Sequence, residues 1–240
     1  MTPVWGRHSC LPSAPWDFSD LMLFLTLAVV AVLPSLLLVK VLAGVLPFGK
    51  PFHALLAQLL WYILIFLALY LLLKIRYGAP FWRSLGWRFP FRGAALALVS
   101  GPLLVVTLGL IALLIRTPVL NPPFEQMLNN RPTIVFFALF VVVLGPLSEE
   151  LVFRGFLLPL LIRPLGLAGG IVVTGLIFGA LHAYEYEWSW RHSLLISLAG
   201  MAFGWARYVS GSTAASTFMH ATFNLTQFIA LLAREGIPKH

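Results

Sequence analysis

Residues 94–115 read AALALVSGPLLVVTLGLIALLI, a run of apolar and small residues without a charge. A helix of this length spans the hydrocarbon core of a bilayer, which needs roughly 20 apolar residues. Two further charge-free runs of the same character lie at 21–39 and 54–73. These three segments predict membrane-spanning helices and decide the fold class.

The composition of the whole chain agrees with a membrane protein. Of its 240 residues, 60% are hydrophobic and 10% are charged, whereas soluble domains have about 45–50% and about 25%. The net charge of +8 would suggest nucleic acid in a soluble protein, but here the basic residues lie in short segments between apolar runs. We therefore expect membrane lipids as partners and no nucleic acid. The single cysteine, Cys10, cannot form a disulfide within this chain.

The second half of the chain contains further apolar runs, some of them short. They cover 133–147, 151–162, 165–181, 194–206 and 213–233. Gly145-Pro146 interrupts the first of these runs, and proline kinks or breaks a helix because it lacks an N–H donor. We expect either one long kinked helix over about 133–163 or two half-spans. The prediction is an all-α polytopic membrane protein, one domain over 1–240, with a bundle of seven or eight transmembrane helices around an intramembrane polar cavity.

Residues 74–92, KIRYGAPFWRSLGWRFPFR, predict an interfacial segment. Its basic residues alternate with aromatic ones; the bases are Lys74, Arg76, Arg83, Arg88 and Arg92. Aromatic rings at headgroup level and bases near anionic lipid are typical of the cytoplasmic membrane face. This assignment also predicts a cytoplasmic N-terminus. The first apolar run shows no obvious cleavage site, so we expect it to remain in the membrane.

Two adjacent acidic residues are embedded in the apolar sequence GPLSEELVFRGFLLPLL at 145–161. An ionisable side chain near the bilayer centre costs at least about 2.5–3.5 kcal/mol, so each one calls for a function or a partner. Glu150 and Arg154 are four residues apart and can form an ion pair on one helix face. Glu149 points about 100° away from that pair and can act as a general base. The alternative is that Glu149 only caps a helix after Ser148.

Two later pairs also carry polar side chains at helical spacing. Phe178 and His182 are four residues apart, as are His220 and Asn224. Each pair alone could provide only structural hydrogen bonds between helices. If the helices are antiparallel neighbours, however, Glu149 and His182 reach the same leaflet and share a pocket that is open to water on one side. A carboxylate, two histidines and an amide suit hydrolysis by an activated water.

The signatures of other intramembrane proteases are missing from the sequence. There is no H-E-x-x-H and no G-x-G-D. The nearest approach to a serine-protease G-x-S-G is 208–211, which has tyrosine in place of the first glycine.

The three motifs Glu149-Glu150-x-x-x-Arg154, Phe178-x-x-x-His182 and His220-x-x-x-Asn224 resemble those of the CPBP family, which includes CAAX proteases and bacteriocin-processing enzymes. The resemblance covers roughly 135–227, with a family-like core at about 133–230. It implies an intramembrane glutamic endopeptidase, similar to the type II CAAX prenyl endopeptidase, that acts on a membrane-associated or prenylated peptide. Carried over by position, it implies that Glu149 and His182 activate water and that His220 and Asn224 form the oxyanion site. Glu150, Arg154 and Phe178 would support them.

Two alternatives stay open. Family members have been interpreted both as metal enzymes and as metal-free ones, and Glu149, His182 and His220 could hold zinc. We expect no cofactor, because the oxyanion role better suits His220 beside Asn224. The second alternative is a non-catalytic membrane immunity or scaffold protein, or a proton-coupled carrier, although the chain lacks the internal repeats usual in transporters.

Overall fold

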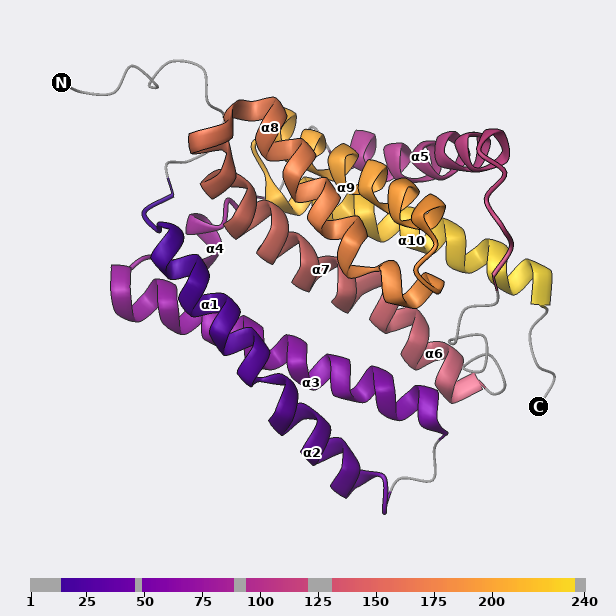
Figure 1. The fold of residues 1–240 in the computed structure, drawn as a ribbon, viewed down its shortest axis with the longest axis horizontal. Helices are drawn as coiled ribbons and strands as arrows, with labels where there is room; N and C mark the ends of the chain where they lie inside the picture. Colours follow the sequence, from indigo (N-terminus) through magenta and orange to yellow (C-terminus); the bar gives the residue numbers. More distant parts are fainter. Residues whose placement is uncertain (1–13, 46–48, 89–93, 121–130, 236–240) are drawn as a thin grey trace.

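The structure, a computed structural model, describes residues 14–45, 49–88, 94–120 and 131–235. Every regular element within those ranges is helical, which confirms the predicted all-α fold there (Figure 1). In chain order the α-helices are α1 (Phe18–Val30), α2 (Val32–Leu42), α3 (Lys50–Leu71), α4 (Phe81–Ser84), α5 (Ala94–Leu114), α6 (Arg131–Leu139), α7 (Gly145–Glu150), α8 (Leu158–Leu181), α9 (Trp190–Ser210) and α10 (Thr213–Glu235). The π-helical segments are η1 (Leu72–Arg76), η3 (Phe140–Leu144) and η4 (Leu151–Leu157), and η5 (Ala183–Tyr186) is a 3₁₀ turn. Cys10 and Arg92 lie outside the described residues.

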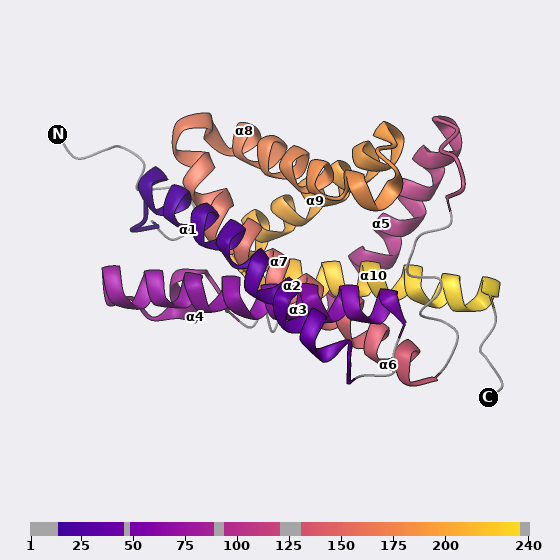
Figure 2. The same cartoon turned by 60° about the horizontal axis from the view of Figure 1, so that its bottom comes forward.

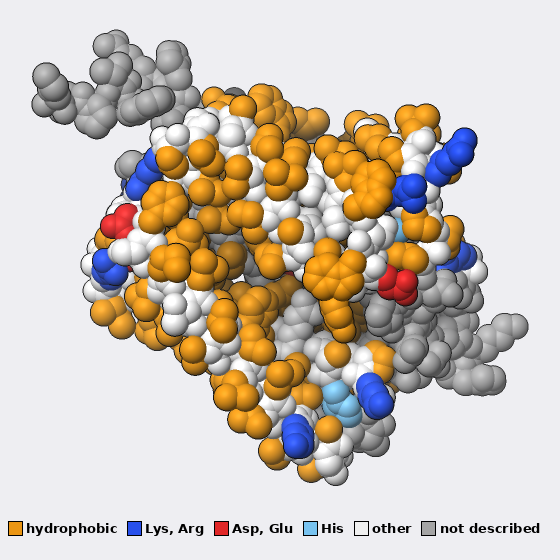
Figure 3. Space-filling view, in the orientation of Figure 1, with side chains coloured by type: hydrophobic (Ala, Val, Ile, Leu, Met, Phe, Trp, Pro, Cys, Tyr) orange, Lys and Arg blue, Asp and Glu red, His pale blue; other side chains and the backbone are white. Residues whose placement is uncertain are grey.

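Among the described residues, four helical stretches are long and apolar enough to cross a membrane. They are Phe18–Leu42, Lys50–Arg76, Ala95–Leu114 and Arg131–Leu181. Hydrophobic side chains cover most of the face shown in Figure 3, with charged ones toward its edges. Large apolar residues such as Val29, Leu103 and Leu114 are exposed, which suits contact with lipid and not with water. The fold is therefore of the membrane type, while the count of seven or eight spans remains a prediction.

The chain passes through Gly145-Pro146 as a continuous helix, which settles the two alternatives for this stretch. α6, η3, α7 and η4 follow one another without a gap and lead into α8. Pro146 lacks an N–H, and its ring would clash with the carbonyl one α-helical turn earlier. The preceding segment η3 is wider than an α-helix and gives the ring room. Of the two alternatives left open by the sequence, the single long helix is the one that forms.

The chain reverses later, inside α8. Gly166 has φ 69° and ψ 176°, a conformation that is open to glycine and strongly disfavoured for other residues. Pro164, two residues earlier, disfavours an α-helical continuation of the residues before it. After the reversal, Gly170 packs so closely on Ile162 that a Cβ at Gly170 would lie 2.6 Å from Ile162 Cγ1. The rest of α8 therefore returns beside the helix that precedes the turn.

Glycines on one side of α8 bring it into close contact with α9. A Cβ at Gly175 would lie 2.8 Å from the Ser197 carbonyl oxygen, and one at Gly179 would lie 2.4 Å from the Ser193 carbonyl oxygen. Small residues of this kind let two membrane helices approach at backbone distance. Figure 2 shows α8 and α9 running together above α10. This packing fixes the end of α8, which His182 directly follows, against α9.

α1 and α3 pack against the long helix from the opposite side, and α2 packs on α3 (Figure 1). The Trp16 indole N–H donates to the Phe156 carbonyl at 2.9 Å, and the two rings stack at 5.3 Å. Deeper in the bundle, the Tyr62 ring of α3 stacks on Phe140 of η3 with centroids 5.7 Å apart. α3 is thereby fixed against the helix that carries the two adjacent glutamates.

The described part of the basic segment is anchored in the bundle. Leu85 is fully buried, and a Cβ at Gly155 would lie 3.0 Å from its Cβ. The Thr213 hydroxyl at the start of α10 donates to the Leu85 carbonyl. Trp82 and Arg83 are exposed, which agrees with an interfacial position. Its location on the cytoplasmic face remains a prediction.

Candidate active site

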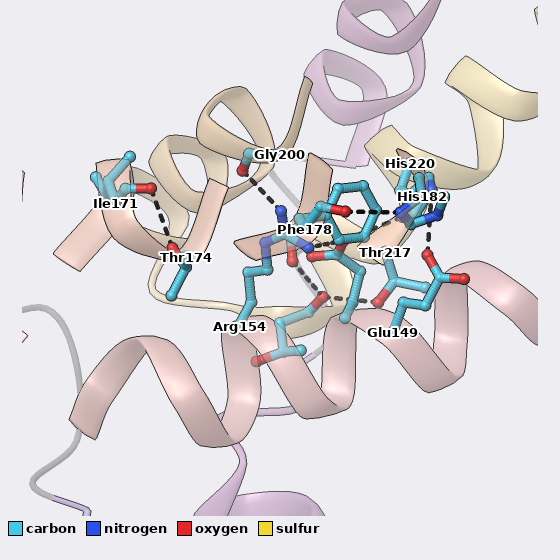
Figure 4. Close-up of polar contacts among 12 residues, drawn as sticks. Glu149, Arg154, Ile171, Thr174, Phe178, His182, Gly200, Thr217 and His220 are labelled. Carbon is cyan, nitrogen blue, oxygen red and sulfur yellow. Dashed lines mark hydrogen bonds and ion pairs between the residues drawn. The ribbon is translucent and has the colours of Figure 1, made fainter. Parts of the chain in front are cut away.

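Phe178 lies at the centre of the candidate site and is 2% exposed. Its ring centroid is 4.5 Å from that of His182 and 5.8 Å from that of His220. The Arg154 guanidinium lies 4.8 Å from the same centroid, within the range of a cation–π contact. Residues from η4, the end of α8 and α10 therefore meet around one aromatic side chain (Figure 4).

Glu150, Arg154 and His220 form a buried charged chain. Arg154 Nη1 is 2.8 Å from Glu150 Oε1, and His220 Nδ1 is 3.0 Å from the same oxygen. Arg154 Nη2 also donates to the Gly200 carbonyl of α9 at 2.7 Å. The side chains of Glu150 and Arg154 are fully buried, so each must be paired to offset the loss of hydration. The ion pair predicted from the four-residue spacing is confirmed.

Glu149 points away from that pair and toward His220, as Figure 4 shows. Its Oε2 lies 3.9 Å from His220 Nε2, and its side chain is 18% exposed. Its Oε1 accepts a hydrogen bond of 2.7 Å from the Tyr62 hydroxyl of α3. Glu149 lies inside a helix that continues into η4, so the capping alternative does not apply.

Sequence reasoning did not identify Tyr62. The signal that could have found it is Gln58-x-x-x-Tyr62, a polar pair at helical spacing inside an otherwise apolar span. The Gln58 amide donates to the Tyr62 hydroxyl at 3.1 Å. The partner of this pair on another helix could not be read from the spacing alone.

His182 follows the last residue of α8 and has a defined tautomer. Its Nδ1 lies 2.7 Å from the Phe178 carbonyl oxygen, and a carbonyl oxygen only accepts, so Nδ1 carries the hydrogen. In the neutral ring, Nε2 then holds the lone pair that a general base needs. In the part of the chain that the structure describes, no hydrogen bond or ion pair joins His182 directly to Glu149.

Asn224 lies one turn after His220 on α10 and contacts the long helix. Its Nδ2 donates to the Val141 carbonyl in η3 at 2.7 Å. In a π-helical turn this carbonyl would accept from the residue five positions later, which is Pro146 and has no N–H. The amide thus supplies the hydrogen bond that proline cannot. A second N–H on Nδ2 is left for another acceptor.

Glu185 lies in η5, the turn next to His182, and its side chain reaches the surface. Desolvation by surrounding protein atoms raises the pKa of Glu185; nearby His182 lowers this pKa and Glu149 raises it. Glu185 therefore lies near enough to both predicted catalytic residues to be affected by their charges.

Carboxylate and imidazole groups are possible metal ligands. Among the described residues, no three or more His, Cys, Asp or Glu side chains are grouped to hold a metal ion. Glu149, His182 and His220 therefore do not form such a group in this structure.

Residues 131–226 match the family model of the type II CAAX prenyl endopeptidase, Rce1-like. No curated protein and no solved structure matches the chain. The matched residues contain all three sequence motifs, from Glu149 to Asn224, whereas Tyr62 precedes them. The match confirms the family resemblance carried by those motifs.

Proposed function

The chain is Rce1-like over residues 131–226, and on that premise we propose that it hydrolyses a peptide bond of a membrane-associated or prenylated substrate through a water activated by Glu149 and His182. The family match supports the activity of a CAAX-type intramembrane protease in general. The glutamic mechanism and the substrate class belong to the proposal.

One observation carries the mechanism. His182 and His220 both contact the Phe178 ring within an apolar bundle, and Glu149 lies beside His220. One polar atom of each side chain is engaged by Tyr62, Phe178 or Glu150. The other atoms are His182 Nε2, Glu149 Oε2 and His220 Nε2, of which the last two are 3.9 Å apart, beyond direct hydrogen-bond distance. This spacing suits a water shared by the carboxylate and the imidazole.

Each of these residues has its own role in the proposed reaction. Glu149 Oε2 accepts a proton from water while the water oxygen attacks the peptide carbonyl carbon, and His182 Nε2 orients that water by accepting its other hydrogen. His220, as an imidazolium, can donate Nδ1–H to Glu150 and Nε2–H to the oxyanion, and the second Asn224 N–H donates to the same oxygen. When the C–N bond breaks, Glu149 returns its proton to the leaving amine.

Glu150 and Arg154 act through His220. The carboxylate holds the imidazole by Nδ1, and the arginine holds the carboxylate at 2.8 Å. Such an arrangement fixes the orientation of a histidine that must donate from its other nitrogen.

Cleavage of a prenylated peptide tests the proposal. The purified chain in proteoliposomes is incubated with a farnesylated, internally quenched CAAX peptide, and mass spectrometry identifies the products. We expect one cleaved peptide bond in the wild type and no cleavage by His182→Ala. The control is His53→Ala, which alters a histidine in the first turn of α3, nine residues before Tyr62, and should retain activity. Lack of cleavage by the wild type on prenylated and on transmembrane reporter peptides would favour the non-catalytic alternative.

A further inference from the structure

Tyr62 is the contact that α3 makes with the candidate site. Its side chain is 6% exposed, and its hydroxyl lies 2.7 Å from Glu149 Oε1. α3 precedes the Rce1-like residues 131–226 in the chain. The contact thus joins the N-terminal helices to the carboxylate on which the proposed reaction depends.

The direction of the hydrogen bonds is set by the groups involved. The Gln58 amide donates to the Tyr62 hydroxyl at 3.1 Å, and an ionised carboxylate can only accept. The phenol has one hydrogen, and it is therefore directed at Glu149. Gln58, Tyr62 and Glu149 form a chain of donors that ends on the carboxylate.

The ring of Tyr62 is also fixed, by contacts with two aromatic side chains. It stacks on Phe140 with an interplanar angle of 5°, and the Trp61 ring lies 5.7 Å away on its own helix. Phe140 is the first residue of η3, the π-helical segment that accommodates Pro146. The phenol therefore approaches Glu149 from a rigid surface of the same long helix that carries the glutamate.

The two oxygens of the Glu149 carboxylate therefore have different surroundings. Oε1 is occupied by the phenol, and Oε2 is left facing His220 Nε2 at 3.9 Å. We propose that Tyr62 is a positioning residue that orients Glu149 and leaves Oε2 free for water; this inference rests on the proposed function.

Tyr62→Phe tests the inference because it removes only the hydroxyl. Without that hydrogen bond the Glu149 carboxylate is no longer held in one orientation, so the chemical step should slow while substrate binding is retained. We expect kcat to fall about 10- to 100-fold with KM nearly unchanged. Gln58→Met should lower kcat by a smaller factor, because the phenol then loses its own donor.

Tyr70→Phe is the matched control. Tyr70 lies on the same helix, is 40% exposed, and makes a ring contact with Phe81. Its variant should retain the wild-type kcat and KM. A Tyr62→Phe protein with the wild-type kcat, or one whose loss of kcat/KM comes from KM alone, would overturn the positioning role.

A second readout does not need catalysis. Thermal unfolding is measured for Tyr62→Phe, Glu149→Leu and the double variant. Tyr62→Phe should have a lower Tm than the wild type. The double variant should have a Tm equal to or above that of Glu149→Leu, because in Glu149→Leu the phenol is buried without its acceptor. Additive Tm changes would overturn the inference. If the wild type cleaves no peptide while the Tm changes remain coupled, only the proposed function fails.

Discussion

Glu149 and Glu150 are adjacent in the chain, yet the structure gives them different environments. Glu150 is fully buried and shared by Arg154 and His220, whereas Glu149 is partly exposed and faces Tyr62 and His220. The 100° step between neighbouring helical residues is the cause. One carboxylate is thus a structural anchor and the other is available for chemistry.

The Glu150–Arg154 pair predicts coupled stability effects. Each single change to alanine leaves an unpaired charge in the bundle, and we expect a loss of about 3–5 kcal/mol in the free energy of unfolding. The double variant should lose less than the sum of the two singles. Denaturation of the four proteins in one detergent measures the coupling, and strictly additive losses would show that the charges do not interact.

At the scale of elements, the contact between α8 and α9 positions His182. Gly179 lies three residues before His182, and a Cβ there would lie 2.1 Å from Ser197 Oγ. We expect Gly179→Ala to cost about 1–3 kcal/mol of stability and to reduce turnover, because the end of α8 must move away from α9. Gly109→Ala in α5 is the control, since no atom lies within 4 Å of its added Cβ. Equal stability of the two variants would contradict this packing.

The turn η5 predicts a dependence of stability on pH. The pKa of Glu185 is raised by desolvation, so the native state holds this proton more tightly than the unfolded state. Its contribution to stability is complete below the ordinary glutamate pKa and is lost as the pH rises through the raised native value. Glu185→Gln should therefore match the wild-type Tm at about pH 4 and exceed it at about pH 7. A Tm difference that stays constant with pH would rule out this role of the carboxyl group.

Local sequence patterns predict some of these helices and contacts and not others. Charge-free runs predict the first three long helices, and helical spacing predicts the Glu150–Arg154 pair, because both depend only on local geometry. The sequence left one long kinked helix and two half-spans open at Gly145-Pro146, because hydropathy carries no signal for the π-helical segment that accommodates Pro146. Tyr62 was missed because spacing identifies a polar face but not the distant helix that packs on it.

At the scale of the whole molecule, an apolar exterior surrounds a small polar centre. The exposed Leu and Val side chains of α1, α2 and α5 match lipid, and the charged chain of Glu150, Arg154 and His220 is enclosed between helices. This arrangement suits a site that receives a membrane-associated peptide and admits limited water.

The whole protein should work without a metal if its own side chains activate water. Chelators should then leave turnover intact, and metal analysis should find well under about one equivalent of zinc per chain. His220→Ala should slow the chemical step by about 10²–10³-fold, as expected for one lost oxyanion donor. Stoichiometric zinc in the wild type that is absent from His220→Ala would instead make His220 a ligand.

The most direct test of the account compares kcat/KM of the wild type and Glu149→Gln on one farnesylated peptide in matched proteoliposomes. The substitution keeps the size of the side chain and an acceptor for Tyr62, but it removes the base. Loss of a general base should lower kcat/KM by about 10²–10⁴-fold while the Tm changes little. A Glu149→Gln protein that cleaves the peptide within a few-fold of the wild-type rate would contradict the account.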